Sequence, residues 1–388
     1  MRIYKFDDIK SKMNKKKIII MVVILIVILF FTLYKFCYPF RQLVNNICSI
    51  TPSINLNLTT LYVDNESING IVGYDKYFSI LSQNKLSTYT TKEKADFETN
   101  VKITNMISSQ SGSYLAIAQK NATDLYLFNG DNLKYEINTT GNISQISVNK
   151  NGYVAVSVAK SGYRTIIVLY NPQGQEVFTT YLVNTYANDI KISDNNKYLA
   201  FSEIDTSGIQ PVSKIKFIQI DKVGTDNYII DTETEENTII SKLEFHNNNE
   251  VIYLTDGKIK KVNINGEKTD ILDISNKNIL NIDISLGNVI VIVEKNSNNL
   301  FKNSNDIKTY DLSGNLISSY QVDYTIKQLK VNDNIICANI GQTAYFITSS
   351  GRLINKYEAK ADIKDVIIYD NGTMAALIYR NKIELMYI

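Results

Sequence analysis

Apolar and polar residues follow a repeating order along most of the chain. Between Ile68 and Ile388 the same series occurs eight times: an apolar strand, a turn with Gly or Asn, a second apolar strand, and another strand pair. The second strand is apolar almost throughout, as in Tyr153–Val158 and Asn288–Val293, which is typical of strands covered on both faces. A period of about 40 residues made only of strands and turns is typical of β-propeller blades.

The pattern therefore predicts an all-β fold, an eight-bladed β-propeller of four-stranded antiparallel blades. In the third unit, the turns Asn149–Gly152 and Asn171–Gly174 contain residues that accept positive φ or preset a turn. From hub to rim, the strands of this unit are predicted at Ile143–Val148, Tyr153–Ala159, Thr165–Tyr170 and Glu176–Val183.

The last unit has only three strands before the sequence reaches Ile388, and a ring needs a fourth strand there to avoid an open edge. The segment Leu56–Val63, just before the first unit, has the composition of a strand. We expect it to pair with Lys382–Ile388 and close the circle. A seven-bladed ring is the alternative if the weakest unit, Ser67–Lys102, is irregular.

A separate apolar run lies near the N-terminus. Ile18–Tyr34 contains no charge, Pro or Gly, and its 17 residues would form a helix of about 26 Å. Extended to Tyr38, the helix approaches the roughly 30 Å hydrocarbon thickness of a bilayer. Seven basic residues precede the run and only Lys35 and Arg41 follow closely, which predicts an uncleaved signal-anchor with a cytoplasmic N-terminus.

The expected domain organisation follows from these two features. It comprises a basic cytoplasmic tail at 1–17, a single transmembrane helix at 18–38, a linker at 39–53 and an extracytoplasmic propeller at 54–388. The first 40 residues hold eight of the 41 basic and two of the 39 acidic side chains, so the remainder carries a net charge of −4. That remainder lacks the basic footprint of a nucleic-acid-binding domain, and no nucleic-acid partner is expected.

Residue types that carry cofactor or metal chemistry are scarce. The sequence has no Trp, a single His and three Cys without metal-ligand spacing, so we expect no cofactor, no metal and no enzymatic activity. His246 falls at a predicted turn, and one His alone forms neither a zinc site nor a nucleophile–base pair. Whether Cys48 pairs with Cys337 stays open. Three carboxylates are expected to line the central channel as solvated charge: Asp189, Asp283 and Asp365.

The stretch Ile143–Ile220 is similar to a known protein family. The similarity lies in the segments Asn151–Val156, Val168–Gly174 and Ile192–Phe201. The stretch resembles an uncharacterised family of membrane-anchored extracytoplasmic β-propeller proteins of low-GC Gram-positive bacteria, a domain of unknown function of WD40- or quinoprotein-like type. The resemblance implies one N-terminal anchor and an outside propeller. It implies no activity for any residue.

Long connections between the second and third strands are predicted at Lys160–Arg164, Ile204–Val212 and Lys295–Asn305. They emerge on the same face as the acidic connection Glu233–Glu236. Aromatic, apolar and Arg residues on such loops are typical of binding hot spots, although neutral insertion is the alternative, because surface loops tolerate added length. The candidate partner-binding residues are Tyr163, Arg164, Ile209, Gln210, Leu300, Phe301, Glu233, Glu235 and Glu236.

The favoured function is a non-catalytic, membrane-anchored platform that binds a protein of the cell envelope. One alternative is a module that binds cell-wall carbohydrate or peptidoglycan. A further alternative is a propeller hydrolase or lyase that uses carboxylates near the channel. The sequence names neither the partner nor the oligomeric state.

Overall fold

The computed structural model describes residues 15–36, 59–63, 68–224, 228–232, 234–296 and 304–388. The chain divides into two compact units, residues 1–53 and 54–388. The first contains helix α1 (Lys15–Phe36). Within the described residues, no helix reaches the length and apolar character needed to cross a membrane, so the transmembrane helix predicted at 18–38 is not supported. The predicted linker at 39–53 lies outside the described residues.

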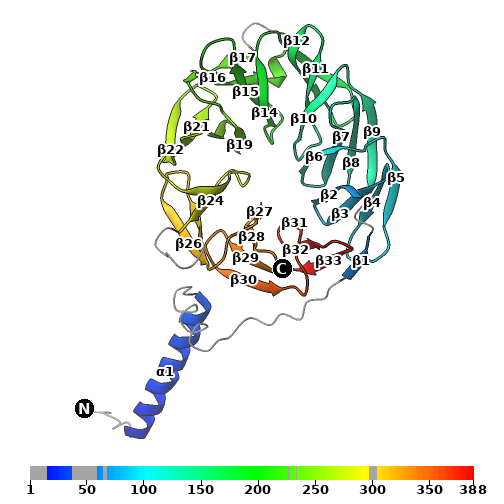
Figure 1. Ribbon diagram of the computed structural model, residues 1–388. Coiled ribbons are helices and arrows are strands. Elements are labelled where there is room, and N and C mark those ends of the chain that lie inside the picture. Colours follow the sequence, from blue (N-terminus) through cyan, green and yellow to red (C-terminus); the bar gives the residue numbers. More distant parts are fainter. Residues whose placement is uncertain (1–14, 37–58, 64–67, 225–227, 233, 297–303) are drawn as a thin grey trace, which may run out of the picture. The chain divides into compact units, whose positions relative to one another are not determined.

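The second unit is a ring of eight antiparallel sheets formed by its described residues (Figure 1). In each of the first seven blades the strands follow chain order from the channel to the rim. Blade 1 consists of β2 (Ile68–Tyr74), β3 (Tyr77–Ser82), β4 (Lys85–Tyr89) and β5 (Phe97–Asn100). Blade 2 consists of β6 (Met106–Ser111), β7 (Tyr114–Gln119), β8 (Asp124–Asn129) and β9 (Asn132–Asn138). Blade 3 consists of β10 (Asn142–Val148), β11 (Val154–Lys160), β12 (Tyr163–Tyr170) and β13 (Glu176–Leu182).

The fourth blade differs from the others in its outer strand, which is split into two short pieces that both pair with β16. Blade 4 consists of β14 (Tyr186–Ile192), β15 (Tyr198–Asp205), β16 (Val212–Gln219), a 3-10 helix (Ile220–Lys222), β17 (Ile229–Asp231) and β18 (Glu235–Glu236). Blade 5 consists of β19 (Lys242–Asn247), β20 (Glu250–Leu254), β21 (Lys258–Asn263) and β22 (Lys268–Asp273).

The remaining blades return the ring to its starting point. Blade 6 consists of β23 (Ile279–Asp283), β24 (Ile290–Lys295), β25 (Asn305–Tyr310) and β26 (Leu316–Val322). Blade 7 consists of β27 (Gln328–Asn332), β28 (Ile335–Asn339), β29 (Thr343–Thr348) and β30 (Leu353–Glu358). Blade 8 consists of β31 (Asp365–Tyr369), β32 (Met374–Ile378), β33 (Lys382–Tyr387) and, from the start of the unit, β1 (Thr59–Tyr62).

The predicted closure of the ring is confirmed. β1 pairs antiparallel with β33, from Thr59 opposite Leu385 to Tyr62 opposite Lys382. Leu61 on β1 is only 5% exposed and joins an apolar cluster with residues of blades 8 and 1. The strand from the N-terminal side therefore supplies both the missing hydrogen-bond ladder and part of the seal between the last and first blades.

Eight blades are confirmed over seven because the weak first unit forms a regular four-stranded sheet. Its first turn lies at Asp75–Lys76, and Gly73 is inside β2. A Cβ at Gly73 would lie 2.7 Å from Cβ of Tyr369 on blade 8. The glycine therefore marks the close approach of two blades.

The core consists of apolar clusters between neighbouring blades, one at each of the eight boundaries formed by the described residues. The second strands explain this arrangement. In β11, Val154, Val156 and Val158 pack toward blade 2, whereas Ala155 packs toward blade 4. An inner strand covered on both faces needs apolar side chains at successive positions, which is why these strands show little alternation.

Two of the predicted loops, Lys160–Arg164 and Ile204–Val212, are shorter in the structure. Only Ser161 and Gly162 connect β11 to β12, so Tyr163 and Arg164 belong to strand β12. Gly162 has φ of 93°, and a positive φ permits a two-residue hairpin turn. The connection after β15 is a loop, at 206–211. Most of the third predicted loop, 297–303, lies outside the described residues.

Candidate functional site

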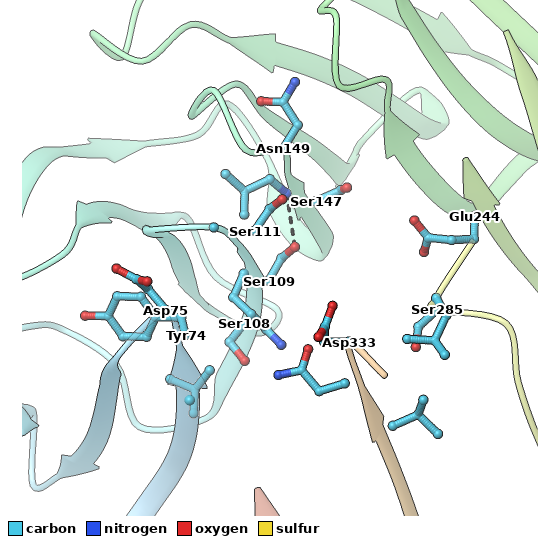
Figure 2. Close-up of a pocket in the computed structure, with 18 of the residues that line it drawn as sticks. Tyr74, Asp75, Ser108, Ser109, Ser111, Ser147, Asn149, Glu244, Ser285 and Asp333 are labelled. Atoms are coloured by element: carbon cyan, nitrogen blue, oxygen red, sulfur yellow. Dashed lines mark hydrogen bonds between the residues drawn. The ribbon is translucent and has the colours of Figure 1, made fainter. Parts of the chain in front are cut away.

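A pocket of about 810 Å³ opens at the end of the channel where the first and second strands of each blade are joined. Its lining comes from the innermost strands and their turns in all eight blades. Serine, asparagine and aspartate side chains dominate the wall (Figure 2). The pocket is therefore a polar site to which every blade contributes.

Hydrogen bonds between blades fix the turns around this pocket. Asn149, only 3% exposed, donates from Nδ2 to the carbonyl of Ser193 at 3.0 Å and to Oδ1 of Asn196 at 2.6 Å. Its own Oδ1 accepts from the backbone N–H of Tyr153 at 3.1 Å. A buried amide satisfied in this way holds one blade in register with the next.

Two carboxylates of the pocket pair with lysines. Oε2 of Glu244 lies 2.9 Å from Nζ of Lys191, and Oδ1 of Asp365 lies 3.4 Å from Nζ of Lys330. Burial raises the pKa of Glu244, while the charge of Lys191 acts in the opposite direction. Both lysines are thus engaged by acidic partners from neighbouring blades.

Three further aspartates occupy the corresponding turns of adjacent blades. Asp333, Asp370 and Asp75 lie in blades 7, 8 and 1, with φ of 51°, 54° and 43°. Asp370 accepts a hydrogen bond from the hydroxyl of Thr373 at 2.8 Å. Asp75 and Asp333 take part in no ion pair with any residue that the structure describes. This arc makes one side of the pocket negatively charged.

The predicted channel aspartates have different roles. Asp365 lines the pocket. Asp189 accepts from the backbone N–H groups of Leu243 at 2.8 Å and Ile190 at 2.9 Å, and Asp283 accepts from the N–H of Ser285 at 2.8 Å. The last two carboxylates therefore stabilise the backbone and do not border the pocket.

His246 lies at the end of β19 and does border the pocket. Its Nδ1–H donates to the carbonyl of Gly287 in the next blade at 2.7 Å. In the part of the chain that the structure describes, no three His, Cys, Asp or Glu side chains form a group that could hold a metal ion. Cys337 is buried and unpaired, and Cys48 lies outside the described residues.

An exposed cluster of aromatic residues occupies the opposite end of blades 3 and 4. The rings of Tyr163 and Tyr181 are 4.9 Å apart. Nη1 of Arg164 donates to the hydroxyl of Tyr186 at 2.8 Å, and its guanidinium carbon lies 5.4 Å from the centroid of that ring. We call Tyr163, Arg164, Tyr181, Val183 and Tyr186 the tyrosine–arginine surface.

The side chains of this surface are accessible although they contact one another. Tyr163 is 39% exposed, Tyr181 56% and Tyr186 38%. Tyr181 and Tyr186 were not predicted as site residues. The alternation of exposed and buried positions along a strand could have identified them. Tyr181 stands next to buried Leu182 at the outer edge of blade 3, and Tyr186 stands next to buried Ala187. Ile209, fully exposed, and Gln210 lie in the loop that follows β15.

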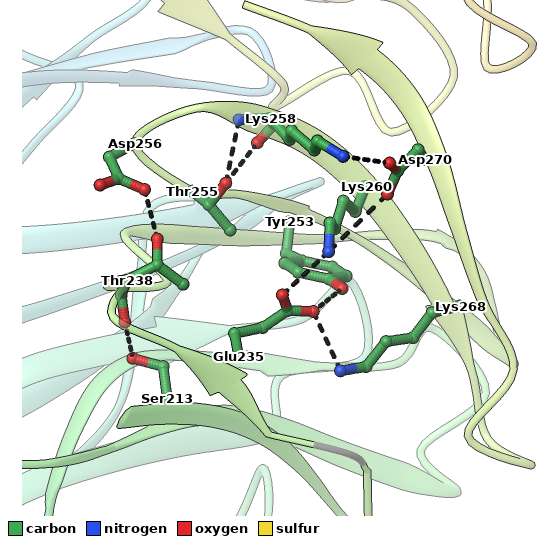
Figure 3. Close-up of polar contacts among 10 residues, drawn as sticks. All are labelled: Ser213, Glu235, Thr238, Tyr253, Thr255, Asp256, Lys258, Lys260, Lys268 and Asp270. Atoms are coloured by element: carbon green, nitrogen blue, oxygen red, sulfur yellow. Dashed lines mark hydrogen bonds and ion pairs between the residues drawn. The ribbon is translucent and has the colours of Figure 1, made fainter. Parts of the chain in front are cut away.

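Glu235, by contrast, is occupied by a polar network between blades 4 and 5 (Figure 3). Its carboxylate accepts from Tyr253 at 2.8 Å, Lys260 at 2.8 Å and Lys268 at 2.9 Å, one residue from each of β20, β21 and β22. Although burial raises the pKa of Glu235, hydrogen bonds from these three side chains hold it below its usual value. Glu235 thus joins two blades.

The remaining predicted site residues divide into two groups. Glu236 is exposed and pairs with Val212 through the backbone of β18. Three residues lie outside the described residues: Glu233, Leu300 and Phe301.

Comparisons with known proteins give a family and a fold. Residues 57–388 match the family described as a family of unknown function (DUF5711). No curated protein matches the chain. The Dos1 propeller is similar, at 10% identity and a TM-score of 0.55 over 85% of this chain and 94% of that one.

Two further solved structures show the same architecture. Sqt1 from Chaetomium thermophilum matches at 10% identity and a TM-score of 0.54, over 84% of this chain and 98% of that chain. Apo AztD from Citrobacter koseri matches at 10% identity and a TM-score of 0.50, over 76% and 87%. At such identities the likeness establishes the propeller fold alone.

Proposed function

The chain belongs to the DUF5711 family of unknown function, and we propose that it is a non-catalytic propeller that binds a protein partner through the tyrosine–arginine surface. The main support for this proposal is a pair of contacts between exposed side chains. The rings of Tyr163 and Tyr181 contact each other, and beside them Arg164 packs over the ring of Tyr186. Tyrosine and arginine are the residue types enriched at the energetic centres of protein interfaces.

The geometry of the surface favours binding because its side chains are already ordered. Arg164 is held by a hydrogen bond and a cation–π contact to Tyr186. The backbone N–H of Ala187 donates to the hydroxyl of Thr165 at 3.3 Å, which ties the first strand of blade 4 to blade 3. A preordered surface loses less conformational entropy when a partner binds.

Val183, 56% exposed, adds apolar area next to the aromatic rings, and Ile209 adds more in a neighbouring loop on the same face. Exposed apolar groups in contact with polar ones match the composition of protein interfaces.

The proposal also places the propeller at a membrane, outside the cytoplasm. Its support is the charge-free run Ile18–Tyr34, the seven basic residues before it, and the apolar side chains of α1 between Ile20 and Leu33, which are 36–65% exposed. Fractionation of cells that produce the full chain tests the attachment, and protease treatment of intact spheroplasts tests the side. A chain recovered without membranes, or a protected propeller, would refute this part.

Capture of the partner from solubilised membranes tests the binding surface. The Tyr163→Ala/Tyr181→Ala variant should recover at least tenfold less of the protein that the unaltered chain retains. The matched control is Tyr387→Ala, which removes a tyrosine that is 49% exposed on blade 8. Equal losses in both variants would argue against a role for this surface.

Binding of a cell-wall polysaccharide is the second candidate, because tyrosine faces also pack on sugar rings and two such faces lie together at Tyr163 and Tyr181. Co-sedimentation with purified cell wall distinguishes the two. Retention on the wall that is lost in the Tyr163→Ala/Tyr181→Ala variant would replace the protein partner with a carbohydrate.

A further inference from the structure

The pocket at the turn end of the channel has the dimensions of a small-molecule site and is separate from the tyrosine–arginine surface. Its volume of about 810 Å³ lies within the roughly 300–1,000 Å³ of typical ligand pockets. All eight blades contribute to its wall, so its shape is fixed by the closed ring.

Ser147 on β10 provides an independent indication of a ligand. It borders the pocket and is only 7% exposed. Its hydroxyl has no hydrogen-bond partner within the described parts of the chain and faces the cavity (Figure 2). A hydroxyl that is open to a pocket and not engaged by the protein can donate to or accept from a polar group of a ligand.

The charge of the wall defines which polar group fits. Lys191 and Lys330 are the lysines that border the pocket, and each is paired with a carboxylate. Asp333, Asp370 and Asp75 add negative charge from three consecutive blades, and the backbone N–H of Asp370 donates to the carbonyl of Asp75. The wall therefore has an excess of carboxylates over lysines, and a concave site with an excess of one sign of charge concentrates ligands of the opposite sign.

Figure 2 shows the carboxylates of Asp333 and Glu244 directed into the cavity from two sides. The described side chains hold no metal-binding group of three, which favours an organic cation over a metal ion. An ammonium group donates up to three hydrogen bonds and accepts none, matching acceptors such as carboxylates and the Ser147 hydroxyl.

We propose that this pocket binds a small organic cation that carries ammonium groups, with Asp75 and Asp333 as its charge partners and Ser147 as an additional acceptor. The inference is independent of the proposed protein-binding surface. It assigns the two faces of the propeller to different ligands.

Calorimetric titration of the full chain in detergent with spermidine tests the proposal. The unaltered chain should bind with saturable heat. The Asp75→Asn/Asp333→Asn variant should bind at least tenfold more weakly, and Ser147→Ala should also weaken binding. Asparagine tolerates the positive φ of both turn positions, so these substitutions preserve the backbone. The control Asp362→Asn removes one exposed carboxylate outside the pocket and should bind within twofold of the unaltered chain.

Magnesium chloride at equal ionic strength separates site binding from general screening and should neither bind saturably nor compete. The proposal is overturned by an absence of saturable heat, by unchanged binding in the double variant, or by equal weakening in Asp362→Asn. Thermal unfolding of every variant shows that it is folded. If the double variant is not folded, the single variant Asp333→Asn is used in its place, and it must weaken spermidine binding at least threefold.

Discussion

The two faces of the propeller differ in how their side chains are used. At the turn end, the polar residues bond across blades: Asn149 links to Ser193 and His246 to Gly287. On the other face, Tyr163 contacts Tyr181 within blade 3 and Arg164 contacts Tyr186 of blade 4, yet these side chains stay exposed. The comparison indicates that the first end holds the ring together around a polar pocket, whereas the second is free to contact another molecule.

Adding a methyl group at a glycine of each end gives the largest expected difference. Gly287, at the turn end, has φ of 67°, and a Cβ there would lie 2.5 Å from the carbonyl oxygen of Phe245. Gly162, at the other end, has φ of 93° with nothing within 4 Å of the added atom. Both alanines strain the backbone, but only Gly287→Ala also clashes.

We therefore expect Gly287→Ala to lower the free energy of unfolding by about 3 kcal/mol and Gly162→Ala by about 1 kcal/mol. Denaturant titration of both variants measures the difference. Equal losses would mean that the two ends are packed alike.

Removal of the Glu235 charge should lower the free energy of unfolding by a somewhat smaller amount. Glu235→Gln leaves Lys260 and Lys268, each with a side chain 17% exposed, without their shared carboxylate. We expect a loss of about 2 kcal/mol in the free energy of unfolding. Glu236→Gln, at the adjacent exposed position, is the control and should stay within about 0.5 kcal/mol. A stable Glu235→Gln variant would show that this network does not join blades 4 and 5.

The same network predicts a pH dependence. The folded-state pKa of Glu235 lies below its usual value of 4.5, as do those of Glu294 and Glu384. Their stabilisation is therefore present above about pH 4.5 and is lost as pH falls through the lower folded-state values. Unfolding followed between pH 6 and pH 3 should show a decline that is shallower in Glu235→Gln. A parallel decline in both proteins would contradict this assignment.

The smallest effect on stability is expected at the tyrosine–arginine surface. Tyr181→Ala removes a side chain that is 56% exposed on an outer strand, so the free energy of unfolding should change by less than about 0.5 kcal/mol. Thermal unfolding measures this directly. A loss above 2 kcal/mol would reassign Tyr181 from binding to support of blade 3.

Much of the fold could be predicted from the sequence because it depends on local patterns. Strand pairs and turns recur within each unit, and the missing fourth strand near Ile388 required a partner, which Thr59–Tyr62 supplies. Gly73 shows a limit of such patterns, because it lies inside a strand and permits the close approach of Tyr369 from another blade. A glycine used for close approach looks like a turn glycine in sequence.

The candidate site was harder to predict because it depends on contacts between distant residues. Glu235 appeared to be part of an acidic loop, yet its three partners lie 18 to 33 positions further along the chain. Arg164 was identified by its residue type, but the side chain that orients it, Tyr186, was not. The aspartates of the pocket come from separate blades. Asp333 and Asp370 are 37 positions apart, close to the blade period, but that spacing does not show that their side chains border one pocket.

Site-specific photo-crosslinking in intact cells tests most directly whether the tyrosine–arginine surface binds a partner. A photoreactive phenylalanine analogue would replace Tyr181, and separately Tyr387 as the control on blade 8. If the surface binds a partner, position 181 should give a discrete adduct of higher mass, weakened by Arg164→Ala, and position 387 should give none. No adduct from 181, or the same adduct from both positions, would contradict it.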